Sequence, residues 1–173
     1  MRVLEDPCYK YTSTTYYLNN YYILYHKQLN ISNILYLFMF VKIDYRETDL
    51  RTTMNLLFKE HSHEIQLENL FLGDIIILND ELEEKIIFER KSLYDLAASI
   101  KDGRYAEQSY RLNECSQHNH NIVYVIEGDL ERYNPTKGRM DKKTLYSALI
   151  TLNYFKGFSV IRTKNINETC ELI

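Results

Sequence analysis

One charged tripeptide at the end of an apolar run most constrains how this chain can fold. Residues 85–91 read Lys-Ile-Ile-Phe-Glu-Arg-Lys, a sequence typical of a β-strand. Because successive side chains in a strand point to opposite faces, Glu89 and Lys91 are expected on one face and Arg90 on the other. An acid and an amine are thereby placed side by side.

The preceding segment predicts a hairpin that brings a second acid to the same place. The apolar run 75–78 is joined to the strand above by the turn-forming residues 79–80 and a few charged residues. Asp74 opens this run. Folding of the hairpin returns Asp74 to the neighbourhood of Glu89, so two carboxylates and one lysine converge at one end of a sheet.

Length and composition limit the class of protein. The chain has 173 residues and a net charge of −3, so contact with a polyanion must come from a local basic patch. Three cysteines without close pairing (Cys8, Cys115 and Cys170) suit a reducing compartment. The most apolar run, 34–43, is about half the length of a bilayer span. We expect an intracellular protein of the nucleus, cytoplasm or a viral replication site, with no membrane partner.

The chain is expected to divide at residue 39. Residues 1–38 hold eight of the 16 tyrosines and few charges, without a clean helical or strand period. We interpret them as a poorly ordered leader or as non-native upstream sequence, with Met39 as a natural start. The alternative is a helical extension that packs its tyrosines on the core.

Residues 39–173 predict one mixed α/β domain. Strands are expected at 40–44, 64–71, 75–78, 85–91, 122–127 and 158–162, and helices at 49–61, 92–100, 104–116, 141–154 and 166–173. Alternating strands and helices predict a central sheet covered on both faces. Cys115, His118 and His120 have a spacing that zinc ligands can show, but no second cluster accompanies them, so a polar loop is favoured there.

An ordered series of motifs runs through this domain. It consists of Lys42-Ile43-Asp44-Tyr45-Arg46-Glu47, Gly73-Asp74, Glu89-Arg90-Lys91 with Asp95, and Ser99-Ile100 with Asp102-Gly103-Arg104, Gln108 and Arg111-Leu112. The series resembles the nuclease domain of the XPF/Mus group of structure-specific endonucleases. The tail, with 145–149, 157–163 and a final helix around Glu168, resembles the crossover-junction branch of that group.

The resemblance implies a restriction-endonuclease-like fold and Mg²⁺- or Mn²⁺-dependent hydrolysis of branched DNA. The implied substrates are 3′ flaps, forks and Holliday-type junctions in repair or recombination, and the implied assembly is a homodimer or a heterodimer with a related subunit. Family members usually carry a tandem helix-hairpin-helix module after the nuclease domain. This chain stops where that module would begin.

Seven residues are candidates for the chemistry. Asp74 and Glu89 are the expected metal ligands, because carboxylate oxygens suit Mg²⁺. Lys91 would orient or deprotonate the attacking water, or meet the charge of the reacting phosphate. The remaining four are Asp44, Glu47, Arg90 and Asp95. Asp44 and Glu47 would ligate a second ion or hold Lys91 and Arg90 in place. Arg90 would form a buried ion pair or contribute its backbone to the metal site. Asp95 would support the site, although it is also expected to cap a helix together with Ser92.

A DNA-binding face is predicted next to this site. Arg104, Gln108 and Arg111 follow helical i, i+4, i+7 spacing, and Lys101 precedes them. Contacts there would go to phosphates, although a solvated charged helix face is the alternative. An apolar stripe at Leu145, Ala148, Leu149 and Leu152 is either a dimer surface or core.

The leading hypothesis is a metal-dependent endonuclease. Two alternatives remain open: a non-catalytic DNA-binding subunit of the same fold, and a phosphodiesterase acting on RNA or a small nucleotide. The first is disfavoured because Asp74, Glu89 and Lys91 are all present. The second is not excluded, since a metal ion acts on any phosphodiester.

Overall fold

The computed structural model describes residues 40–58, 65–138 and 140–173. Residues 39–173 form one compact unit. The predicted leader therefore lies outside the described residues.

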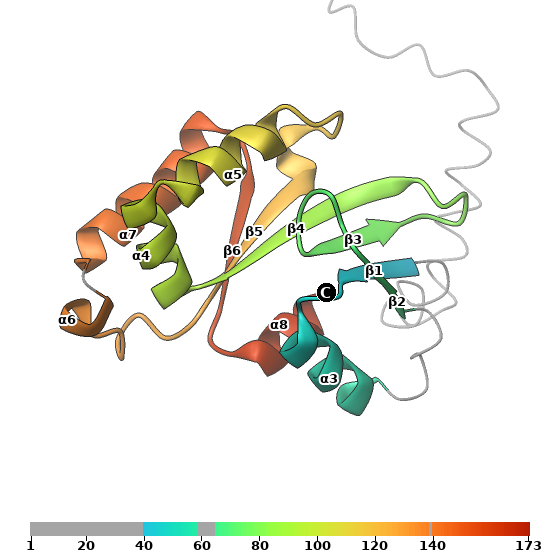
Figure 1. Ribbon diagram of the computed structural model, residues 1–173, viewed down its shortest axis with the longest axis horizontal. Helices are drawn as coiled ribbons and strands as arrows, with labels where there is room; N and C mark the ends of the chain where they lie inside the picture. The colour runs from blue at the N-terminus through green and yellow to red at the C-terminus, as the bar shows by residue number, and fades with distance from the viewer. Residues whose placement is uncertain (1–39, 59–64, 139) are drawn as a thin grey trace, which may run out of the picture. The chain divides into compact units, whose positions relative to one another are not determined.

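A six-stranded mixed sheet forms the centre of the domain (Figure 1). The strands are β1 (Phe40–Asp44), β2 (Ile65–Glu68), β3 (Ile75–Leu78), β4 (Glu84–Ser92), β5 (Ile122–Glu127) and β6 (Ser159–Thr163), in the order β2-β1-β3-β4-β5-β6. Strand β3 pairs antiparallel with β1 on one side and with β4 on the other. The pairs β1–β2, β4–β5 and β5–β6 are parallel. The β3–β4 hairpin lies in the middle of the sheet.

Helices cover both faces of this sheet. They are α3 (Thr48–Leu57), α4 (Leu93–Asp102), α5 (Arg104–Asn113), α6 (Pro135–Gly138), α7 (Lys142–Ile150), which continues into a π-helical turn η3 (Thr151–Phe155), and α8 (Ile166–Leu172), with a 3-10 turn η2 (Asn119–Asn121). Figure 1 shows α4, α5 and α7 gathered on one side and α3 with α8 on the other. Within the described ranges, no helix combines the length and apolarity needed to cross a membrane.

The alternation of strand side chains builds two cores. Ile76, Ile87 and Tyr124 pack on the face of α4, α5 and α7. Their strand neighbours Ile75 and Phe88 pack on the opposite face with α3 and α8. Each fully buried side chain of this kind contributes about 1.5–3 kcal/mol, so both helical layers are held by apolar burial.

The apolar stripe of α7 belongs to the first of these cores. Leu145 and Leu152 are fully buried, Ala148 is buried, and Leu149 packs against the same cluster. Of the two interpretations that the sequence left open, core packing is therefore the correct one for this stripe.

The predicted fold class, a mixed sheet flanked by helices, is confirmed. The helix predicted at 49–61 ends at Leu57, the helix predicted at 104–116 ends at Asn113, and α6 was not predicted. Strand β2 ends at Glu68 rather than at Phe71. The chain turns there because Leu70 is buried and its N–H donates to Asp44 Oδ2 at 3.0 Å instead of continuing the ladder. This early exit leaves residues 69–74 as a loop beside the hairpin.

Candidate active site

The β3–β4 hairpin places Asp74 directly against β4. The Asp74 N–H donates to the Phe88 carbonyl at 2.7 Å, and the Arg90 N–H donates to Asp74 Oδ2 at 2.8 Å. Asp74 precedes Ile75, so strand alternation places it on the same face as Ile76, which is also the face of Ile87 and hence of Glu89. The two acids that the sequence predicted to converge therefore share one face of neighbouring strands.

Gly73 makes this close approach possible. Its φ of +73° lies in the left-handed region that side chains disfavour. A Cβ at this position would lie 2.5 Å from Ile87 Cγ2 and 2.9 Å from the Phe88 carbonyl oxygen. Only glycine allows the loop to enter β3 at this distance from β4.

Glu89 and Lys91 form a buried ion pair on that face. Lys91 Nζ lies 2.9 Å from Glu89 Oε1, and the two side chains are 7% (Lys91) and 8% (Glu89) exposed. Strand alternation explains the pairing, as predicted. One amine thus compensates one of the two acids.

Asp74 lacks such a partner among the described residues. Burial, followed by repulsion from Glu89 and Glu47, raises the pKa of Asp74 to about 8. The Arg90 N–H and the charge of Lys91 act in the opposite direction but do not balance these effects. The site therefore has a deficit of positive charge, which a proton on Asp74 or a bound cation can remove.

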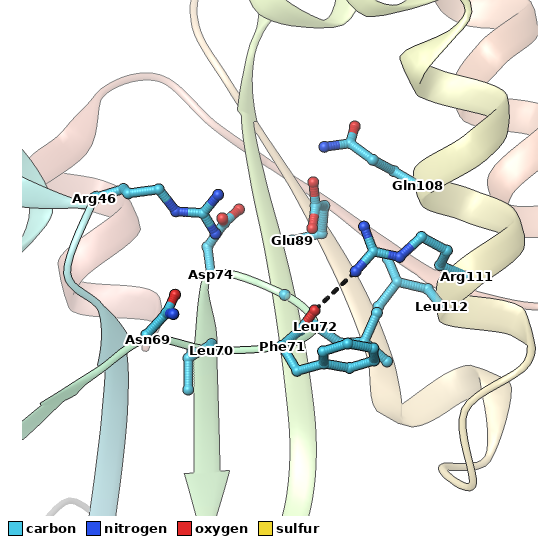
Figure 2. A pocket seen from close by; sticks show the side chains of 11 residues that line it. Arg46, Asn69, Leu70, Phe71, Leu72, Asp74, Glu89, Gln108, Arg111 and Leu112 are labelled. Carbon is cyan, nitrogen blue, oxygen red and sulfur yellow. Dashed lines mark hydrogen bonds between the residues drawn. The ribbon is translucent and has the colours of Figure 1, made fainter.

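A pocket of about 380 Å³ opens above the two acids. Figure 2 shows Asp74 and Glu89 between Arg46 on one side and Gln108 and Arg111 on the other. The rest of the lining comes from Asn69, Leu70, Phe71, Leu72, Gly73 and Leu112. Two acids on the floor and two guanidinium groups at the sides suit a ligand that carries both a cation and a phosphate.

Comparison with known proteins identifies the domain. Residues 43–173 match the ERCC4 domain family model. The chain belongs to the ERCC4 domain family. It is 34% identical over 125 residues to a probable crossover junction endonuclease mus81 of Dictyostelium discoideum, covering 62% of this chain and 13% of that protein. It is 29% identical to the ERCC4 domain-containing protein EP364R of African swine fever virus, covering 73% of this chain and 34% of that protein.

The solved structures agree with this assignment. XPF from Aeropyrum pernix in complex with DNA superposes with a TM-score of 0.56 at 26% identity, over 76% of this chain and 60% of that one. The chain spans only about an eighth of the Dictyostelium relative. The similarity therefore concerns the XPF/Mus81-type nuclease domain.

On the opposite face of β4, the ERCC4 domain holds a second charged cluster. Arg90 Nη1 lies 2.8 Å from Glu47 Oε2, and Arg90 Nη2 lies 2.8 Å from Glu127 Oε1. Thr169 on α8 donates its hydroxyl to Glu127 Oε2 at 2.8 Å. Glu47 thus binds Arg90, one of the two roles expected for it, and Arg90 forms the expected ion pair.

Asp44 is occupied by local donors. It is 1% exposed and accepts bonds from Arg46 Nε at 2.6 Å, Arg46 Nη2 at 3.1 Å, the Arg46 N–H at 2.9 Å and the Leu70 N–H at 3.0 Å. The Arg46 side chain contributes most to lowering the pKa of Asp44. Asp44 supports the pocket by holding Arg46 and the loop at Leu70, and it does not line the pocket itself.

Three other candidates do not line the pocket. The Asp95 N–H donates to Ser92 Oγ at 3.0 Å, and Ser92 Oγ donates to Asp95 Oδ2 at 2.6 Å, which is the helix cap that competed with a role in the site. Arg104 pairs with Asp102 at 2.8 Å on the surface. Lys101 is exposed near the end of α4. Of the predicted DNA face, Gln108 and Arg111 reach the pocket.

Sequence reasoning missed several residues of this ERCC4 domain. Arg46 stands in the first motif, but its role became visible only with the loop that carries Asp74. Two side-chain atoms in the described part of the chain are buried without a hydrogen-bond partner: Oε1 of Gln108, which the sequence placed on the DNA face, and the hydroxyl of Tyr124, which the sequence did not single out. Tyr124 is the register partner of Glu89 in β5. The sequence could have indicated this residue, because Tyr124 brings a hydroxyl group into an otherwise aliphatic strand.

A resident metal would be held by few protein ligands. In the described ranges, no group of three or more His, Cys, Asp or Glu residues converges in the manner of a metal cage. Asp74 and Glu89 form a pair of hard oxygen donors with a deficit of positive charge. That donor set fits Mg²⁺ or Mn²⁺, which bind through one or two carboxylates and take further oxygens from water and phosphate.

Proposed function

We propose that this domain is a metal-dependent endonuclease that hydrolyses phosphodiester bonds in branched DNA. The observation that carries the proposal is the pair Asp74 and Glu89, which share one strand face with only one compensating amine among the described residues. Membership of the ERCC4 family and relatives named as crossover junction endonucleases support it.

The metal is part of the proposal, with Asp74 and Glu89 as its ligands. Among the described residues, Asp74 Oδ2 accepts one N–H and the other carboxylate oxygen accepts none, which leaves it available for coordination. A bound Mg²⁺ or Mn²⁺ would polarise the phosphate and supply a bound water of lowered pKa. Buried acids of raised pKa at a pocket are typical of functional sites.

The chain's own residues bind and orient the substrate. Lys91 is 7% exposed and is not among the residues that line the pocket. It donates one N–H to Glu89 Oε1, and its two remaining N–H donors would serve a phosphate oxygen or the attacking water. Arg46 donates Nε and Nη2 to Asp44, which leaves its Nη1, within the part of the chain that the structure describes, able to bind phosphate at the pocket side. Arg111 provides a second guanidinium on the opposite side.

A direct test is to incubate the purified full chain with four DNA substrates of the same sequence and to measure their cleavage. The substrates are a fork, a 3′ flap, a four-way junction and a plain duplex. We expect cleavage of the branched substrates with Mg²⁺ or Mn²⁺ and none with EDTA. Asp74→Asn and Glu89→Gln should lower cleavage by about 1,000-fold while keeping DNA binding. Matched controls are Asp80→Asn in the hairpin turn and Glu84→Gln on the same strand, both exposed and outside the pocket.

Each alternative has its own outcome in this assay. Binding of branched DNA without cleavage under any metal condition would indicate the non-catalytic subunit. Preferential cleavage of an RNA version of the same fork would indicate a different phosphodiester substrate. Cleavage that persists in Asp74→Asn or Glu89→Gln would refute the metal ligands.

Dimerisation with a second copy or a related subunit is also proposed. The support is an exposed apolar surface on α7 and η3, where Ile150, Tyr154 and Phe155 are 60%, 78% and 75% exposed. Exposed aromatic side chains in a group of this kind favour a protein interface. Light scattering should give a dimer that Tyr154→Ser combined with Phe155→Ser converts to a monomer. An unchanged mass in that variant would refute this surface.

A further inference from the structure

Phe71 is displayed at the side of the pocket instead of being buried. Its side chain is 85% exposed, the largest value among the exposed large apolar residues of the described ranges. It lines the same pocket as Asp74 and Glu89 (Figure 2). Apolar burial does not explain the position of this ring, because most of its surface is exposed.

The backbone that carries Phe71 is held on both sides. On one side Leu70 is buried and its N–H is bound to Asp44 Oδ2. On the other side the Asp74 N–H is bound to the Phe88 carbonyl. Arg111 Nη2 also donates to the Phe71 carbonyl at 3.0 Å. The ring is therefore presented by an anchored loop rather than by a freely moving one.

A cation sits beside the ring. The Arg111 guanidinium carbon lies 5.4 Å from the centre of the Phe71 ring, which is a cation–π contact. Because the side chain is still 85% exposed, ring surface is left for a second planar group. One nucleotide presents both a flat base and a phosphate, so a ring and a guanidinium at adjacent places can bind it together.

We propose that Phe71 stacks on an unpaired base next to the phosphate that is cleaved at Asp74 and Glu89. Arg111 would bind the neighbouring phosphate. The inference rests on the proposed function. A base inside a duplex is stacked on both faces, and exposing one face costs a few kcal/mol of unstacking. An unpaired base at a branch point offers its face without that cost. Phe71 would thus favour branched over uninterrupted DNA.

The test compares Phe71→Ala with Phe71→Trp in a Glu89→Gln background, so that binding is measured without cleavage. Loss of one stacked base weakens binding by about 5- to 150-fold. We expect Phe71→Ala to weaken binding to a fork with unpaired bases by about tenfold and to a plain duplex by less than about twofold. Phe71→Trp should keep the wild-type affinity. Leu56→Ala, which removes a 65% exposed apolar side chain from α3, is the matched control.

Two further readouts report on the stacking itself. A 2-aminopurine placed at the unpaired position beside the branch should lose fluorescence on binding, and Phe71→Ala should restore it. The slope of affinity against salt should stay the same in Phe71→Ala, because no phosphate contact is removed, whereas Arg111→Gln should reduce it by about one unit. Thermal melting of each variant identifies loss of folding.

The outcomes separate this inference from the function on which it rests. If the protein with Glu89 intact cleaves branched DNA but Phe71→Ala binds fork and duplex like its parent, the stacking site is refuted and the nuclease stands. Equal weakening on fork and duplex also refutes it. A change of oligomeric mass in Phe71→Ala would assign the ring to a protein partner. A wild-type protein that neither binds nor cleaves any branched substrate overturns both proposals.

Discussion

Asp44 and Asp74 occupy paired strand ends and have opposite electrostatic surroundings. The Asp44 N–H donates to the Asp74 carbonyl at 2.8 Å, so the two residues are direct neighbours in the sheet. Asp44 accepts four hydrogen bonds from Arg46 and Leu70, and its pKa is lowered. Asp74 accepts one, from the Arg90 N–H, and burial with repulsion from other acids raises its pKa to about 8.

The difference separates a structural acid from a reactive one. The negative charge of Asp44 is matched inside the protein, so no ligand is needed to stabilise it. The charge of Asp74 is only partly matched, by the Arg90 N–H and the charges of Lys91 and Arg46, so further positive charge must be brought by a proton or by a ligand. Placing such an acid next to Glu89 lowers the stability of the empty domain, and binding of a cation can restore this stability.

The largest effect is expected from Asp74→Asn, which should lower the rate of DNA cleavage by about 1,000-fold. An ion and its ligands contribute several kcal/mol to transition-state stabilisation, and about 4 kcal/mol corresponds to this factor. Single-turnover cleavage of a fork with Mg²⁺ measures it. Asp44→Asn, compared at equal folded fraction, should lose far less. Equal losses in the two variants would erase the distinction between the two acids.

The second prediction concerns Arg90→Met, which removes the positive charge paired with two acids on the other face of β4. Arg90→Met leaves Glu47 and Glu127 without their common partner, and removing one member of a buried pair costs about 3 kcal/mol or more. Urea denaturation should show this loss of unfolding free energy. Lys85→Met on the same strand breaks an exposed pair with Glu83 and should leave the unfolding free energy nearly unchanged. A similar cost for both would show that the buried cluster contributes nothing special.

The sequence predicted the parts of this arrangement that depend on local geometry. Strand alternation alone placed Glu89 and Lys91 together and Arg90 opposite, because the period of a strand is two. The hairpin signal placed Asp74, since residues 79–80 allow only a short connection between the two strands. Both features concern neighbours in the chain and are independent of the rest of the fold.

The remaining parts depend on which elements meet across the fold. The parallel pairing of β4 with β5 brings Glu127 to Arg90 and Tyr124 to the side of Glu89. The sequence indicated these strands but not their order in the sheet. The exposure of Phe71 could not be foreseen for the same reason, because its segment alternates like a strand until Leu70 leaves the ladder.

A third prediction concerns the matched acid. Asp44→Asn should lower the unfolding free energy by about 2 kcal/mol, because hydrogen bonds to a charged group contribute about 1.5–3 kcal/mol. The loss should be present at neutral pH and should disappear as the pH falls below the ordinary range of a carboxyl, since the folded pKa of Asp44 is lowered and the stabilisation needs its charged form. The same substitution in the exposed hairpin turn, Asp80→Asn, is the control and should change stability little at any pH.

The pH profile of the metal-free protein should have the opposite sign for Asp74. Between about pH 4 and pH 8, the approximate unfolded and folded pKa values of Asp74, the folded state keeps a proton that the unfolded state has released. Stability from this group therefore falls as the pH rises through that window. The difference in melting temperature between Asp74→Asn and wild type in EDTA should grow from about pH 5 to about pH 8. A constant difference would contradict the raised pKa.

The smallest effect tests whether Asp95 is a matched acid like Asp44. Its carboxylate and N–H are both bonded to Ser92 at the start of α4, and the pair is exposed. Ser92→Ala removes the helix cap and should cost about 1 kcal/mol of stability. Cleavage at equal folded fraction should change by no more than about threefold in Ser92→Ala and in Asp95→Asn, because neither residue lines the pocket. If Asp95→Asn instead lost cleavage as completely as Asp74→Asn, the acid would take part in the chemistry, and the contrast between matched and unmatched carboxylates would no longer predict which of them react.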